Sequence, residues 1–81
     1  MSTADIFNTT DLGAAIRELR KERGWTQARL GEWLSVSRPT VAKLETGGAV
    51  NVDVALRALA ILGFVATIHA KGTRLVEVDP E

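Results

Sequence analysis

Apolar residues recur with helical spacing through the first three quarters of the chain. Between residues 12 and 19 they fall three and four positions apart, which places them on one face of a helix that runs to about residue 23. Asn8 is suited to cap the start of this helix, with Asp11 three residues later, and Gly24 is suited to end it in the left-handed conformation. The apolar face consists of Leu12, Ala15, Ile16 and Leu19.

Two shorter helices are predicted next. Thr26 is an N-cap residue for a helix that runs to about Leu34. Ser37 is the N-cap of a third helix, and Pro39 falls in its first turn, where a missing N–H costs nothing. The third helix is expected to end near Thr46, before two consecutive glycines.

A fourth helix is predicted from Asn51 to Gly63, and it is apolar on two sides. Each apolar side of such a helix has to pack against another part of the protein. One such part is the group of preceding helices, and the other is either the C-terminal segment or a second subunit. The two apolar stripes are Val52, Ala55, Leu56, Leu59 and Leu62 on one side and Val54, Ala58 and Ile61 on the other.

After Gly63 the composition changes to β-branched and aromatic residues, so strands are predicted at 64–70 and 73–78. A lone two-stranded ribbon is marginally stable in water. We therefore interpret residues 64–78 as a dimerisation element in which strand 64–70 pairs with its copy in a second chain. A single domain is expected over 1–81, with a helical core at 9–63 and loose ends at 1–5 and 79–81. The candidate dimerisation residues are Phe64, Val65, Ala66, Thr67 and Ile68.

The second and third helices have the spacing of a DNA-binding helix-turn-helix, in which the second helix of the pair lies in the major groove. About three residues separate them, and Gly31 lies where a larger side chain would push them apart. Ser37, Arg38, Thr40 and Lys43 are then left on the outer face of the third helix. The apolar residues that point to the shared core are Leu30, Leu34, Val36, Val41 and Leu44.

Residues 12–62 resemble the phage-repressor-type helix-turn-helix domains of the XRE family. The segments that carry the resemblance are RELRKERGWTQARL (17–30) and SRPTVAKLETG (37–47), with the Leu-rich fourth helix after them. The resemblance implies a mostly α fold with four repressor-like helices. It also implies that Gln27 anchors a DNA phosphate and that Arg20 and Glu45 form a buried structural ion pair. Ser35 is a departure, because the family usually has Gly in the turn.

Arg38 is the best candidate for reading a base, since a guanidinium binds the edge of guanine through two hydrogen bonds. Lys43 faces the groove or contacts only a phosphate. Thr40 could contact either a phosphate or a base. Thr26 is first a cap and secondarily a phosphate ligand. The candidate DNA-binding residues are Thr26, Gln27, Ser37, Arg38, Pro39, Thr40 and Lys43.

A finer resemblance is to HipB-type antitoxins, including the Y4mF-like group. Its basis is the short chain, the last helix running into ALAILGFVATI and a strand tail in place of a fifth helix. This resemblance implies a homodimer that represses its own operon and binds a HipA-like kinase toxin. The alternative is a phage-like or metabolic regulator with no toxin partner. Trp33 stands at a position that is usually polar, so it either contacts a partner or lies over neighbouring side chains.

The net charge is zero, but the charges are segregated. Residues 17–43 carry seven basic and three acidic side chains, and the remainder carries three basic and seven acidic ones. A neutral chain can therefore present one basic face to double-stranded DNA, although solvated helix faces without a partner give the same count.

Several classes of function are disfavoured. The chain has no Cys and one His, which argues against disulfides, a thiolate or His zinc site and a His-based catalytic arrangement. No carboxylate pair in a plausible cleft and no phosphate loop points to an enzyme or a cofactor. No signal peptide or membrane-spanning run is recognised, so a soluble cytoplasmic protein is the default.

Overall fold

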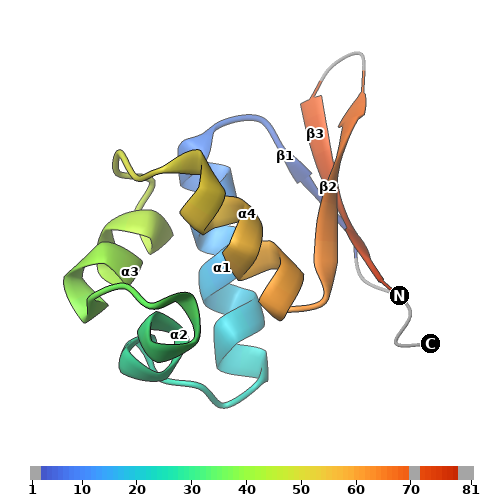
Figure 1. Cartoon of the computed structure of the whole chain (residues 1–81). Coiled ribbons are helices and arrows are strands. Elements are labelled where there is room, and N and C mark those ends of the chain that lie inside the picture. The colour runs from blue at the N-terminus through green and yellow to red at the C-terminus, as the bar shows by residue number, and fades with distance from the viewer. Residues whose placement is uncertain (1–2, 70–71, 79–81) are drawn as a thin grey trace.

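Three layers make up the fold (Figure 1). A small sheet forms one side, helices α1 and α4 pack on it, and helices α2 and α3 lie beyond them. The computed structural model describes residues 3–69 and 72–78. The helices are α1 (Thr9–Glu22), α2 (Gln27–Leu34), α3 (Arg38–Glu45) and α4 (Val52–Ile61). The strands are β1 (Thr3–Ile6), β2 (Phe64–His69) and β3 (Gly72–Glu77).

The helix caps predicted at Asn8, Thr26 and Ser37 are confirmed, and Asn51 caps α4 in the same way. The side chain of each N-cap residue accepts a hydrogen bond from a backbone N–H in the first turn, which satisfies one of the donors that a helix start leaves unpaired. At the end of α1, Gly24 has a φ of +72°, as expected for a residue that stops a helix. The four N-cap residues are Asn8, Thr26, Ser37 and Asn51.

The sheet is antiparallel and has the order β1-β3-β2, so β3 pairs with both other strands. Strand β1 was not predicted, and the expectation of a loose segment at 1–5 is wrong for residues 3–5. Thr3–Ile6 pairs with the second edge of β3, and Ile6 is buried in the core. Residues 1, 2, 70, 71 and 79–81, which include part of both expected loose ends and the last residue of the expected strand 64–70, lie outside the described residues.

The second side of α4 is partly covered by the chain itself. Strand β2 packs against α4, and Phe64 and Leu75 are buried in the same core as the helices. The C-terminal strands are therefore part of the core of one chain. Phe64, a candidate dimerisation residue, is only 4% exposed and offers no surface to a second chain. Val52 and Leu56 on α4 remain exposed.

The turn between α2 and α3 generates a prediction about stability. Ser35 has a φ of 58°, the left-handed conformation that costs a residue with a Cβ about 1–2 kcal/mol. We expect Ser35→Gly to raise the free energy of unfolding by about 1 kcal/mol, because Gly adopts this conformation without the steric cost. The measurement is denaturant unfolding followed by Trp fluorescence.

Gly24→Ala, in the turn after α1, is the matched control for Ser35→Gly. Gly24 also has a positive φ, and a Cβ added there would meet no atom within 4 Å, so only the backbone conformation is affected. The control should lower the free energy of unfolding by about 1 kcal/mol. A loss of stability in Ser35→Gly would contradict the account of the turn.

Candidate nucleic-acid interface

Helices α2 and α3 are joined by a tight turn. The backbone N–H of Val36 donates to Gly31 O at 2.9 Å, and that of Ser35 donates to Glu32 O at 3.2 Å. A Cβ on Gly31 would lie 2.8 Å from Val36 O, closer than side chains approach a backbone oxygen. The requirement for a small residue here is therefore confirmed, and the clash would be with the turn itself.

Helix α3 has one buried face and one exposed face. Val41 and Leu44 pack in the core with Leu30 and Leu34 of α2, and Val36 is partly buried against them. Thr40 is half-buried. The exposed residues at the start of α3 and on its outer side are Ser37, Arg38, Pro39 and Lys43.

At the exposed tip of α3, a hydrogen-bonded cap holds the backbone, and the side chain of Arg38 has no partner among the described residues. Ser37 Oγ accepts from the backbone N–H of Thr40 at 3.3 Å and lies 3.0 Å from Thr40 Oγ1. Within the described residues, no hydrogen bond or ion pair holds the side chain of Arg38. The guanidinium of Arg38 is thus free to bind an external acceptor. The stem of Lys43 lies close to Gly48.

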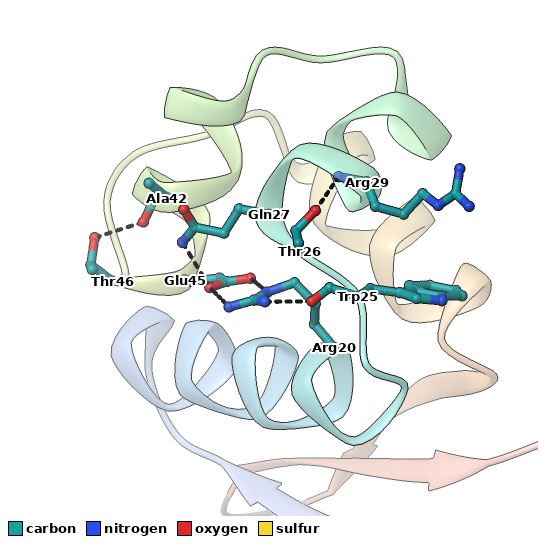
Figure 2. A network of polar contacts seen from close by, with 8 residues as sticks. All are labelled: Arg20, Trp25, Thr26, Gln27, Arg29, Ala42, Glu45 and Thr46. Carbon is teal, nitrogen blue, oxygen red and sulfur yellow. Dashed lines mark hydrogen bonds and ion pairs between the residues drawn. The ribbon is translucent and has the colours of Figure 1, made fainter.

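Arg20 and Glu45 form the buried ion pair that the resemblance implies (Figure 2). Arg20 Nε lies 2.6 Å from Glu45 Oε2, and Arg20 Nη2 donates to Glu45 Oε1 at 3.1 Å. Arg20 Nη1 donates to the backbone oxygen of Trp25 at 2.7 Å. The carboxylate side chain of Glu45 is 1% exposed. The last residue of α3 is therefore bound to α1, and α1 is bound to the segment that leads into α2.

The two candidate residues at the start of α2 also have partners within the chain. Thr26 Oγ1 accepts from the backbone N–H of Arg29 at 3.0 Å, as a cap does. Gln27 is half-buried, and its Nε2 donates to Glu45 Oε1 at 3.1 Å. One of the two N–H groups of the Gln27 amide is thereby used internally, which leaves the other for a ligand.

Gly13 is a structural residue that sequence reasoning missed. A Cβ on Gly13 would lie 2.7 Å from the carbonyl carbon and oxygen of Glu45 and would overlap Leu44 O. Helix α1 therefore crosses the end of α3 with its backbone almost in contact. Only knowledge of this crossing distinguishes Gly13 from an ordinary glycine in a helix.

Three of the seven basic side chains in segment 17–43 are engaged within the chain. Arg20 is buried, Arg23 Nη2 donates to Leu62 O, and Arg29 lies 3.6 Å from Glu32 in an exposed ion pair. These three cations hold the fold together or pair locally. The exposed basic side chains of this segment that have no partner among the described residues are Arg17, Lys21, Arg38 and Lys43.

Trp33 is 57% exposed, and its ring stacks on that of Trp25 with centroids 6.3 Å apart and an angle of 28° between the planes. It thus lies over a neighbouring side chain and still presents a face to solvent.

Among the described residues, no helix is long and apolar enough to span a membrane. The same residues contain no cluster of three or more His, Cys, Asp or Glu side chains that could hold a metal ion.

Comparison with known proteins places the α1–β2 region in a family. A family model described as a helix-turn-helix domain matches residues 11–67. A candidate HTH-type transcriptional regulatory protein of Methanospirillum hungatei is 47% identical over 45 residues, which are 56% of this chain and 15% of that protein. A similar protein of Pyrococcus furiosus is 46% identical over 46 residues, again 56% of this chain and 15% of the relative.

A bacterial relative has a more specific name. The competence pilus inhibition repressor of Acinetobacter baylyi is 43% identical over 37 residues, 46% of this chain and 34% of that protein. The matched segments thus cover from about one-seventh to one-third of these relatives.

Proposed function

The chain belongs to the helix-turn-helix domain family, and we propose that it is a sequence-specific transcriptional repressor that places α3 in the major groove of DNA. The family and the relatives support a DNA-binding transcriptional regulator rather than an enzyme. The observation that carries the finer proposal is the tip of α3. Arg38 is the first residue of α3, and its guanidinium has no partner among the described residues. The N-terminal residues of a recognition helix are the ones that contact base edges.

The remaining candidate residues take supporting roles in this proposal. Ser37 and Pro39 shape the tip, and Thr40 and Lys43 contact bases or phosphates along the groove. Thr26 and Gln27 at the start of α2 face the backbone of the duplex, because the first helix of the motif crosses the backbone.

We further propose that the repressor is a homodimer on a pseudo-palindromic operator. In the described part of the chain, β2 pairs with β3 on one edge and with no strand on the other. Pairing of this edge with its copy would extend the sheet across both chains. Val65, Ala66, Thr67 and Ile68 lie on this strand, and Val65 and Ala66 are exposed.

The resemblance to HipB-type antitoxins supports a still finer proposal, in which the dimer represses its own operon and neutralises a HipA-like kinase toxin. The exposed face of Trp33 is the candidate contact, because Trp is enriched at interface hot spots. The alternative is a phage-like or metabolic regulator without a toxin.

Arg38→Ala tests the DNA-binding proposal in a gel shift on the DNA upstream of the gene. We expect at least about a fivefold loss of operator affinity, since a bidentate base contact contributes about 1–3 kcal/mol of discrimination. Arg38→Lys is the matched control, because it keeps the charge and loses the two-pronged geometry. It should retain binding to unrelated DNA while losing preference for the operator.

Salt provides the second readout for DNA binding. The logarithm of the wild-type affinity should fall with the logarithm of salt concentration by about 0.9 per phosphate neutralised. An affinity that is indifferent to salt, or equal losses of operator and unrelated DNA binding in Arg38→Ala, would count against base reading by α3.

Ala66→Glu tests pairing through β2. Ala66 lies near the middle of β2, so in an antiparallel pair centred on this strand the position lies close to its own copy, and like charges there are destabilising. We expect the dimer to dissociate in sedimentation velocity, while Ala14→Glu on the exposed side of α1 leaves it intact. A dimer that is unaffected by Ala66→Glu would rule out this interface.

Co-expression tests the antitoxin proposal. A HipA-like kinase encoded beside this gene should co-purify with the wild type and with Arg38→Ala, because the tip of α3 is not the proposed contact. It should be lost from Trp33→Ala. If no such kinase gene lies beside this one, or if the kinase fails to bind the wild type, the stand-alone regulator takes precedence.

A further inference from the structure

The carboxylate of Glu45 accepts one hydrogen bond more than its ion pair with Arg20 provides. The guanidinium of Arg20 already engages both carboxylate oxygens, through Nε at Oε2 and Nη2 at Oε1. Gln27 Nε2 adds a third hydrogen bond, to Oε1, at 3.1 Å. Figure 2 shows these groups together between α1, the start of α2 and the end of α3.

The third hydrogen bond fixes which way the Gln27 amide points. A carboxylate only accepts hydrogen bonds, so the NH₂ end of the amide must face Glu45. The amide oxygen of Gln27 points away from Glu45 in Figure 2. One N–H of the NH₂ group remains for a second acceptor. The buried carboxylate of Glu45 thus orients the half-buried side chain of Gln27.

Gln27 stands where the proposed DNA interface needs a backbone contact. It is the first residue of α2 and is half-buried, and its amide is held by the hydrogen bond to Glu45. In a helix-turn-helix, the helix that precedes the recognition helix crosses the DNA backbone, and Gln side chains commonly donate to phosphate oxygens.

We propose that Glu45 is a positioning residue, which holds the Gln27 amide so that its second N–H donates to a DNA phosphate. This inference rests on the proposed DNA-binding function and adds to it a role for a buried carboxylate that cannot touch DNA. Through Gln27, Glu45 contributes to DNA binding in addition to anchoring α3 by its ion pair with Arg20.

A double-mutant cycle of Gln27→Ala and Glu45→Gln tests the proposal. Ordering a flexible side chain in advance improves affinity by about twofold to tenfold. Each single variant should therefore weaken binding by about that factor. The loss should be the same on operator and unrelated duplex, because a phosphate contact carries no sequence information. In the Gln27→Ala background, Glu45→Gln should cause a smaller loss than it causes in the wild type, because only its effect on α3 remains.

Thr46→Ala is the matched control for the cycle. Thr46 neighbours Glu45 and donates to Ala42 O and Lys43 O at 3.2 Å, and among the described residues it has no hydrogen bond to Gln27. Any loss that it causes should multiply with that of Gln27→Ala. If the effects of Glu45→Gln and Gln27→Ala also multiply, Glu45 affects DNA binding only by holding α3, and the proposal is overturned.

The wild type provides a measurement that does not depend on the folding of Glu45→Gln. The side-chain NH₂ resonances of Gln27, assigned by their absence in Gln27→Ala, should be displaced from those of a solvated amide and should shift when DNA is added. Resonances at solvated positions that do not move with DNA would overturn the proposal. A wild type with displaced resonances but no affinity for any DNA would instead refute the proposed function itself, and this inference with it.

Discussion

The buried contact between Arg20 and Glu45 is the interaction on which the arrangement of α1, α2 and α3 depends. A carboxylate with 1% of its side chain exposed is tolerated only because Arg20 engages both of its oxygens. Removing one partner of such a pair typically costs about 3–5 kcal/mol, because the other charge is left buried and unpaired. Small domains have total stabilities of only about 5–15 kcal/mol, so the contact has few substitutes. The crossing of α1 and α3 is further restricted at Gly13, because a Cβ there would overlap the backbone of Leu44 and Glu45.

This anchoring acts at one end of α3 and leaves the other end exposed. Glu45 is the last residue of the helix, whereas Ser37 and Arg38 stand at its start, beyond the tight turn. The anchored end fixes the direction of the helix axis, and the buried Val41 and Leu44 fix its rotation about that axis. The exposed tip can therefore carry polar side chains that contribute nothing to the core, since their placement is set by residues elsewhere. Ser35 adopts a left-handed conformation in the turn although it has a Cβ, which shows that the packing of the two helices outweighs the local preference.

The parts of this structure that could be predicted from the sequence follow from local rules. Caps such as Asn8 and Ser37 act within one turn, and the helical spacing of Leu30 and Leu34 reports burial directly. Strand β1 could not be predicted in this way, because Thr3 pairs with Val76 at the opposite end of the chain. The same is true of the candidate site. The exposed tip of α3 followed from its polar residues. The bond between Gln27 and Glu45 joins residues on different helices, and no local pattern indicates it.

The sheet has two outer edges in the described part of the chain, and they differ in a way that bears on dimerisation. Strand β1 has four residues and carries Asp5, which forms an ion pair with Arg74 at 2.8 Å. Short strands and charged side chains are features by which proteins protect an edge from pairing. Strand β2 has six residues, FVATIH, without Asp, Glu, Lys or Arg, and it lies beside α4, which exposes Val52 and Leu56. Of the two edges, β2 is therefore the one whose composition favours pairing with a second copy. A two-fold axis beside β2 would leave α3 at the far side of each subunit from the sheet (Figure 1), which is compatible with the proposal that each α3 contacts its own half-site.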